Sequence, residues 1–237
     1  MTADIPGASP AQPAVNVAVA FHSDSGHTAK LARSVAAGAA ELEQVQAACH
    51  PVDEISAGLW DALSAADAIV FGSPTYMGGP SAVFKHFAEE SLPIWIRRGW
   101  TGKVAAGFTH SQAMSGDKLN TLQYFSLLAA QHGMIWISLD LLPGWCSQHG
   151  SIDDLNRLGA WLGAMSQSDG DGPPDSNPRP SDLHTARHLG RQVAGVSLAL
   201  ALGRAHMHAG LSRQGSPMTA QALPPGPVSR TGQAALR

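Results

Sequence analysis

The sequence is poor in charge and in long apolar runs. Only 14% of its 237 residues are charged, and no apolar run reaches the ~18 residues that a membrane-spanning helix needs. Residues 1–13 lack the basic start and the apolar stretch of a secretory signal peptide. We therefore expect a cytoplasmic protein with no segment inserted in a membrane.

Cysteine is scarce as well. Cys49 and Cys146 lie almost a hundred residues apart and match neither a disulfide framework nor a zinc-binding spacing. Free thiols are the simpler interpretation, although a single disulfide is compatible with the sequence. His206 and His208 are the nearest approach to a pair of metal ligands. Because two histidines near the end of a chain are more often solvated, we expect no metal.

Basic residues are rare outside the last part of the chain. Residues 203–237 hold four arginines and no acidic residue, so residues 1–202 carry 11 basic and 18 acidic side chains, a net charge of −7. Lys and Arg contacts to phosphates supply most of the non-specific affinity for nucleic acid. We therefore expect no nucleic-acid partner. The apolar fraction of 44% excludes a disordered chain and predicts a packed core.

Strand-like and helix-like segments alternate along the chain. Val15–Phe21 is a nearly continuous apolar run, which is typical of a strand buried on both faces of a parallel sheet. Further strands are predicted at about 48–52, 68–72, 103–109 and 134–139, and helices at about 28–42, near Trp60, at 82–90, at 119–132 and from Pro180 to about Leu202. This alternation predicts an α/β fold, a doubly wound sheet of five parallel strands with helices on both faces.

The same pattern divides the chain into three parts. Residues 15–202 form the predicted domain, residues 1–14 a flexible arm, and residues 203–237 a tail that we expect to be disordered. The segment 141–178 is irregular and interrupts the alternation. Insertions of this length in a compact domain usually form a functional site or an interface.

Three polar loops follow strands of the predicted sheet, where doubly wound sheets bind their ligands. The loop after Phe21 reads Ser23, Asp24, Ser25, Gly26, His27 and Thr28. Hydroxyl groups, a glycine turn and the backbone N–H groups of the following helix favour a phosphate site that needs no lysine. The pattern matches neither a dinucleotide-binding glycine motif nor a P-loop. An ordinary capped turn is the alternative.

The other two loops offer groups that suit a planar ligand. After Pro74, the residues Thr75, Tyr76 and Met77 supply a hydroxyl group, an aromatic ring and a thioether. The last loop is polar, and its candidate residues are Thr109, His110, Ser111, Gln112, Ser115 and Gly116. Because parallel strands end at the same edge of a sheet, we expect the three loops to form one site.

Together these motifs resemble the flavodoxin-like family, and most closely its WrbA-type NAD(P)H:quinone oxidoreductases. Residues 23–28 resemble the family's phosphate loop, Ser/Thr-x-Ser/Thr-Gly-x-Thr, and residues 72–76 resemble its Gly-Ser/Thr-Pro-Thr-x segment. Further matches follow in the family's order: Trp95, Gly102-Lys103, His132-Gly133-Met134, and the segments 168–172 and 180–187. The resemblance covers residues 15–202.

The resemblance implies a non-covalently bound FMN. By position, residues 23–28 would bind its phosphate, residues 74–77 would border its ring, and the candidate residues between Thr109 and Gly116 would contact its polar edge and ribityl chain. It also implies that His132 reaches the flavin from a neighbouring face and that Trp95 lies near the substrate. From the residues alone, His132 is equally a helix C-terminal cap.

The implied activity is the two-electron reduction of a quinone by NADH or NADPH through FMN. The resemblance also implies a homodimer or homotetramer with sites near subunit boundaries. The sequence departs from the family at Ser25, Tyr76 and 112–117, where relatives often carry an aromatic residue, an arginine and a glycine-rich run. These departures weaken nicotinamide recognition more than FMN binding. The alternatives are an FMN-binding electron carrier or sensor without quinone reductase turnover, and a scaffold with a vacant site.

Overall fold

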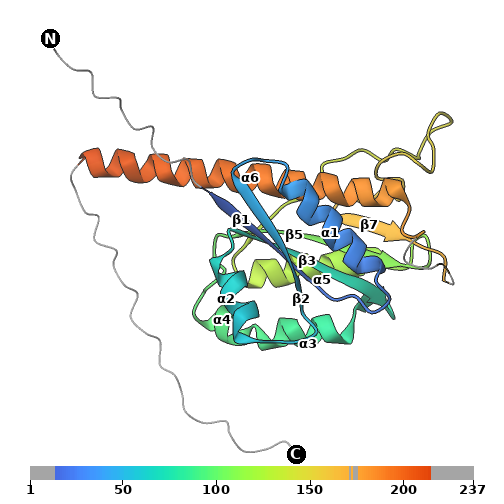
Figure 1. Ribbon diagram of the computed structural model, residues 1–237, viewed down its shortest axis with the longest axis horizontal. Coiled ribbons are helices and arrows are strands. Elements are labelled where there is room, and N and C mark those ends of the chain that lie inside the picture. The colour runs from blue at the N-terminus through green and yellow to red at the C-terminus, as the bar shows by residue number, and fades with distance from the viewer. Residues whose placement is uncertain (1–13, 171, 173–175, 215–237) are drawn as a thin grey trace, which may run out of the picture.

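One mainly parallel sheet organises the computed structural model, which describes residues 14–170, 172 and 176–214 (Figure 1). The strands are β1 (Val15–Phe21), β2 (Val45–Pro51), β3 (Ala68–Tyr76), β4 (Gly79–Pro80), β5 (Val104–Ser111), β6 (Ile135–Trp136) and β7 (Ala164–Gln167). The helices are α1 (His27–Ala39), α2 (Ala57–Ala65), α3 (Ala82–Glu90), α4 (Leu92–Ile96), α5 (Lys118–Gln131) and α6 (Pro180–Gln214).

The expected α/β architecture is confirmed. The strand order is β2-β1-β3-β5-β6, with β4 antiparallel to β3 and β7 parallel to β5. Helices α1 and α6 cover one face of the sheet, and α2 to α5 cover the other (Figure 1). The apolar strands β1, β3 and β5 are therefore buried along almost their whole length. The order reverses between β1 and β3, which places the expected ligand crevice there.

The two faces of the sheet are packed in different ways. Large rings fill the side of α3 and α5, where the centroids of Phe84 and Phe125 lie 4.7 Å apart. On the other side, glycine lets α1 and α6 approach closely. A Cβ added at Gly190 would lie 1.9 Å from the carbonyl oxygen of Val35. This contact fixes the position of α1, whose first turn follows the loop 23–26.

Two short strands occupy the place of the expected fifth strand. β6 pairs with Val104 and Ala105 at the start of β5, and β7 pairs with the end of β5 from Phe108. The irregular chain between them leaves the sheet, and the Leu139 N–H donates to the Trp161 carbonyl at its base (3.0 Å). The strand predicted at 134–139 is limited to Ile135–Trp136, because β7 pairs with the later part of β5.

The last helix is longer than predicted. α6 continues past Leu202 to Gln214, so the expectation of a disordered tail is wrong for residues 203–214. No proline interrupts the chain after Pro180 in this stretch, and a single glycine lowers helix stability without ending a helix. The Arg204 guanidinium donates to the Gly102 carbonyl at 2.6 Å, which fastens the extension to the turn before β5. Residues 1–13 and 215–237 lie outside the described residues.

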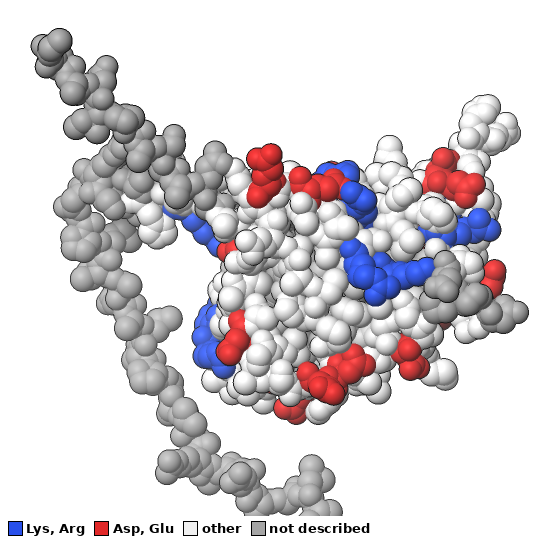
Figure 2. All heavy atoms as spheres, viewed as in Figure 1, with Lys and Arg blue, Asp and Glu red and all other residues white. Residues whose placement is uncertain are grey.

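The surface carries little charge. On the face that Figure 2 shows, acidic and basic side chains are scattered and most of the surface is uncharged. Cys49 and Cys146 are both free, as expected. None of the described helices has the length and apolar character required to cross a membrane.

Candidate functional site

A cavity of about 730 Å³ opens at the carboxyl ends of β1, β3 and β5. This volume lies within the range of small-molecule and cofactor sites. All three predicted loops contribute to its wall, together with the segment before α6. Its described lining residues are Ser25, His27, Thr75, Tyr76, Met77, His110, Ser111, Gln112, Ala113, Gly116, Asp169, Gly170 and Gly172.

The loop after β1 has the geometry of an anion cradle. Gly26 directly precedes α1 and has φ 88°, a left-handed conformation that glycine adopts without steric cost. The Ser23 hydroxyl accepts from the Ala29 N–H (3.0 Å), which ties the loop to the first turn of α1. The first N–H groups of a helix have no intrahelical partner and attract anions. The two interpretations of this loop are therefore compatible. Ser23 bonds to the first turn of α1, and other N–H groups of that turn are still available to a phosphate.

Two buried histidines form the wall between the loops after β1 and β5. The rings of His27 and His110 lie 4.9 Å apart. His27 contacts the Ser25 hydroxyl (3.0 Å) and the Gly172 carbonyl (3.2 Å), and His110 contacts the Ser166 hydroxyl (2.8 Å). Burial, helped by the charges of His27 and Lys118, lowers the pKa of His110 to about 3. His110 is therefore neutral at pH 7.

The loop after β3 presents apolar groups at the mouth of the cavity. Tyr76 and Met77 are exposed, and Met77 has φ 48°, an uncommon value for a residue with a side chain. Burial raises the pKa of the Tyr76 hydroxyl, and the Asp24 carboxylate raises it further. Asp24 is exposed and does not line the cavity. Exposed aromatic and thioether groups at a cavity mouth suit the face of a planar ring.

Hydroxyl groups beneath the cavity support its floor. The Thr75 hydroxyl lies 2.8 Å from that of Thr109 and 2.7 Å from that of Thr121. Thr109 donates to the Ser73 carbonyl and is fully buried, so it supports the floor without lining the cavity. Pro74 is buried in β3 opposite His110. Thr28 is buried as well, in the first turn of α1.

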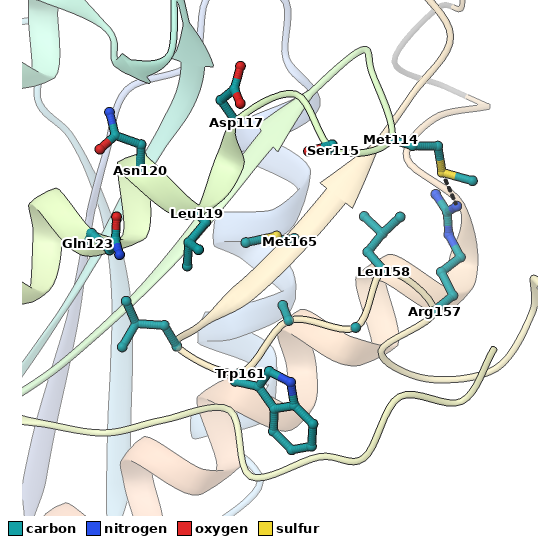
Figure 3. Close-up of a pocket in the computed structure, with 13 residues that line it drawn as sticks. Met114, Ser115, Asp117, Leu119, Asn120, Gln123, Arg157, Leu158, Trp161 and Met165 are labelled. Atoms are coloured by element: carbon teal, nitrogen blue, oxygen red, sulfur yellow. Dashed lines mark hydrogen bonds between the residues drawn. The ribbon is translucent and has the colours of Figure 1, made fainter. Parts of the chain in front are cut away.

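The loop 111–117 separates two cavities. Ser111, Gln112 and Gly116 line the cavity described above, whereas Ser115 lines a second cavity of about 760 Å³. Figure 3 shows this second cavity, in which Met114 and Ser115 lie above Leu158 and Trp161. Ser115 therefore does not reach the predicted site.

His132 and Trp95 lie elsewhere in the chain. Both line a cavity of about 410 Å³ between α3, α4 and α5, near the amino ends of the strands. The His132 imidazole contacts the Ser91 hydroxyl (3.0 Å), and burial lowers its pKa to about 4. His132 is the C-cap residue of α5, which was the alternative expected for it. Within one chain, neither residue reaches the cavity formed by the three loops.

The sequence-based prediction of the site omits two features. Asp169, Gly170 and Gly172 line the cavity, whereas the sequence analysis names their segment as a family match and not as part of the site. Lys118 is fully buried behind Ser111, and the sequence signal for it is only a lysine directly after Gly116-Asp117. Among the residues that the structure describes, no group of three or more His, Cys, Asp or Glu side chains is arranged to hold a metal.

The residues of the loop cavity fit FMN. A left-handed glycine at a helix N-terminus suits a phosphate, and no Lys or Arg side chain is among the described lining residues, so backbone donors carry that role. The exposed Tyr76 and Met77 suit an isoalloxazine face. Polar groups on the loop 111–117 suit the edge of such a ring.

Comparisons with known proteins agree with this geometry. The model of the family described as NADPH-dependent FMN reductase matches residues 18–140. A Pseudomonas aeruginosa protein named flavodoxin FldP is 40% identical over 186 residues, which cover 77% of this chain and 96% of that protein. An Archaeoglobus fulgidus protein named NAD(P)H dehydrogenase (quinone) is 31% identical over 202 residues, with coverage of 76% and 96%. The crystal structure of a flavodoxin, WrbA-like protein from Agrobacterium tumefaciens has a TM-score of 0.62 and 41% identity, and covers 78% of this chain and 98% of that one.

Proposed function

The chain belongs to the NADPH-dependent FMN reductase family, as a flavodoxin-like protein of the WrbA type, and we propose that it is an FMN-dependent NAD(P)H:quinone oxidoreductase. Family membership makes it a flavin oxidoreductase. The nicotinamide donor and the quinone acceptor are our proposal, and the name of the Archaeoglobus relative supports them. The cavity at the β1–β3 switch point is the observation that carries the proposal.

In this proposal the residues 23–28 hold the FMN phosphate. Gly26 makes a left-handed turn directly before α1, where the first N–H groups of the helix would meet the phosphate at one point. His27 is held by Ser25 and the Gly172 carbonyl, which fixes its ring beside that point. Because His110 is neutral at pH 7, it adds a polar contact without adding charge.

The remaining loops position the isoalloxazine ring. Tyr76 and Met77 cover one face, and the groups at Ser111, Gln112 and Gly116 contact the polar edge. When bound, FMN would supply the two-electron redox chemistry between the nicotinamide donor and the quinone acceptor. The protein contributes orientation, a water-poor floor and the placement of both substrates over the open face of the cavity.

We propose that a second copy of the chain completes the site. His132 and Trp95 lie away from the loop cavity of their own chain, yet the short helix α4 exposes three large apolar side chains, Leu92, Trp95 and Ile96. A surface of this kind is typical of a protein–protein contact. Association through it would bring the cavity lined by the exposed Trp95 and the buried His132 of one chain to the flavin of another, and it would make the protein a homodimer or homotetramer.

A one-electron carrier or sensor is the second candidate. The 40% identical relative from Pseudomonas aeruginosa is named a flavodoxin. Ser25 and Tyr76 replace the aromatic residue and the arginine that often occupy these positions in quinone reductases of the WrbA type. Both candidates require FMN, so they differ in turnover alone.

Flavin binding and steady-state turnover test the proposal. The purified full chain is titrated with FMN, and oxidation of NADH and of NADPH is followed with benzoquinone as the acceptor. We expect a yellow complex and quinone-dependent oxidation of one or both nucleotides. A yellow protein without turnover would favour the electron carrier, and a protein that takes up no FMN would refute both candidates.

A matched pair of variants tests the role of the second copy. Trp95 and Trp161 are both exposed, but only Trp95 lies in the cavity with His132. Trp95→Ala should lower turnover and weaken self-association in sedimentation velocity, whereas Trp161→Ala should leave turnover unchanged. Equal turnover of the two variants would contradict a substrate role for Trp95.

A further inference from the structure

Lys118 is a fully buried lysine that lies behind Ser111, a lining residue of the loop cavity. It begins α5, and its ammonium donates to the Ser111 hydroxyl (2.9 Å) and to the carbonyls of Ala113 (2.6 Å) and Met114 (2.8 Å). These three acceptors belong to the loop 111–117, and Ser111 itself lines the cavity. The lysine therefore fixes the loop and lies one hydroxyl group away from the ligand space.

The charge of Lys118 is not neutralised by a direct ion pair. Its three hydrogen bonds end on uncharged oxygens, and no carboxylate among the described residues lies within 4 Å of its ammonium. Asp182 on α6 is the acidic group that acts on it most, but Arg157 holds both carboxylate oxygens at 2.8 and 2.7 Å. The Arg157 charge opposes that of Lys118, and Asp117 directly precedes Lys118 in the chain, in the loop 111–117. His110 on β5 is a further titratable neighbour, and it is neutral at pH 7.

A buried cation without a counter-ion is costly, and such groups cluster where a ligand supplies the missing charge. Burial lowers the pKa of Lys118 to about 8, so most of the population is still protonated at pH 7. The cavity in front of Ser111 is thus biased toward a ligand that carries or gains negative charge.

We propose that Lys118 is a positioning residue for the reduced flavin: it holds the loop 111–117 and, through Ser111, directs a positive charge to the pyrimidine edge of the ring. This inference rests on the proposed function, because it requires FMN in the loop cavity. A two-electron-reduced flavin carries negative charge at that edge, so the lysine favours the reduced cofactor over the oxidised one.

The topology assigns the charge to the ring and not to the phosphate. The phosphate cradle follows β1, whereas Lys118 contacts residues that follow β5, and β3 lies between these strands. In the sheet, β1 and β5 are two strand spacings apart, about 10 Å, although the His27 and His110 rings of the two loops approach to 4.9 Å. Figure 3 shows that Met114 and Ser115, on the same loop, face the second cavity. Lys118 contacts the lining of the first cavity through the Ser111 hydroxyl.

The test uses Lys118→Met with Lys103→Met as its matched control. Like Lys118, Lys103 donates to carbonyl oxygens, in this case those of Ser64 and Ala66. Lys103 is half-buried and directly precedes β5 at its amino end, away from the cavity. Oxidised FMN, reduced FMN and riboflavin are titrated into each flavin-free full-length variant. The two-electron potential of the bound flavin is measured in parallel.

We expect Lys118→Met to weaken reduced FMN about tenfold more than oxidised FMN. For a two-electron couple this difference lowers the potential of the bound flavin by about 30 mV. In Lys118→Met, reduced riboflavin should likewise lose more affinity than oxidised riboflavin. Lys103→Met should show no such difference between the reduced and the oxidised flavin. The difference between wild type and Lys118→Met should also shrink as the pH rises above about 8, where the lysine loses its proton.

Three results would overturn the inference. Equal losses of oxidised and reduced FMN would make Lys118 a purely structural group. A loss confined to FMN and absent for riboflavin would assign the charge to the phosphate. An unchanged affinity and potential in Lys118→Met, with FMN bound by the wild type, would refute the inference while leaving the proposed function intact. A wild type that binds no FMN would refute both.

Two further measurements separate folding from charge. Hydrogen exchange in the flavin-free protein should show faster exchange of residues 111–117 in Lys118→Met and not in Lys103→Met. Lys118→Gln keeps a donor for the loop but removes the charge, so it should restore part of the protection without restoring the potential. Recovery of both by Lys118→Gln would contradict the role of the charge.

Discussion

Gly190→Ala tests how closely α1 and α6 must approach to hold the phosphate loop in place. The added Cβ would lie 1.9 Å from the carbonyl oxygen of Val35 and 2.8 Å from its carbonyl carbon. Both atoms belong to the backbone of α1, so no side chain can rotate to relieve the clash. The helices would have to separate locally by more than an ångström. The packing is equally tight at Gly38, where an added Cβ would lie 1.9 Å from the Arg187 carbonyl oxygen.

The size of the effect follows from two opposing terms. Overpacking a well-filled core typically costs about 1–3 kcal/mol and occasionally more, and a clash with backbone belongs at the upper end. Alanine in place of glycine returns up to about 1 kcal/mol of helix propensity. We expect Gly190→Ala to lower the free energy of unfolding by about 2 kcal/mol, which shifts the urea midpoint by about 1 M if the slope is ~2 kcal/mol per M.

Gly195 supplies the control on the same helix. A Cβ added there meets nothing within 4 Å, so Gly195→Ala should raise the free energy of unfolding by about 0.5–1 kcal/mol. Both variants are unfolded in urea and followed by circular dichroism. Because α1 begins at the phosphate loop, Gly190→Ala should also weaken FMN binding. A Gly190→Ala protein as stable as Gly195→Ala would refute the close approach of the two helices.

Three other predictions follow from single residues of the site and its surroundings. Gly26→Val forces a β-branched residue to φ 88°, which costs about 1–3 kcal/mol locally. The affinity for FMN should fall at least tenfold in a fluorescence titration, and an unchanged affinity would show that the phosphate binds elsewhere. Arg157→Met leaves the buried Asp182 carboxylate without its partner and should lower the free energy of unfolding by about 3–5 kcal/mol. Asp182→Asn added to that variant should recover part of the loss, and no recovery would argue against an ion-pair cause. His110 takes up a proton near pH 6.5 in the unfolded chain but only near pH 3 in the folded protein. The free energy of unfolding should therefore fall as the pH drops from 6.5 to 3. His110→Gln should make this fall less steep, and an unchanged slope would show that other groups cause it.

Local patterns in the sequence located most of the elements. The helix predicted at 82–90 is α3, because Ser81 caps it by accepting from the Phe84 N–H and its apolar residues recur at helical spacing. The strand at 15–21 is β1, because an apolar run that only Asn16 interrupts is stable where both faces of the strand are buried. These features depend on neighbours a few residues away.

The sequence also located the three loops but not the part that each residue has in the site. Thr109 and Phe108 are neighbours on β5 and both are fully buried, so the alternation of polar and apolar residues does not show that Thr109 supports the floor of the cavity and does not line it. Ser115 and Gly116 are neighbours, yet they face different cavities because Gly116 and Asp117 both adopt positive φ. A turn of that kind cannot be read from hydrophobic periodicity.

By itself, the sequence determined the fold class, the polar loops at the strand ends and the family. Only the tertiary structure decided that the fifth strand is split, that α6 extends to Gln214, that His132 and Trp95 lie apart from the loop cavity, and that Lys118 is buried behind Ser111. The physical reason is the distance along the chain over which the interactions act. Strand and helix preferences arise from neighbouring residues, whereas the burial of a charge or the pairing of β7 with β5 depends on segments that meet only after the chain has folded.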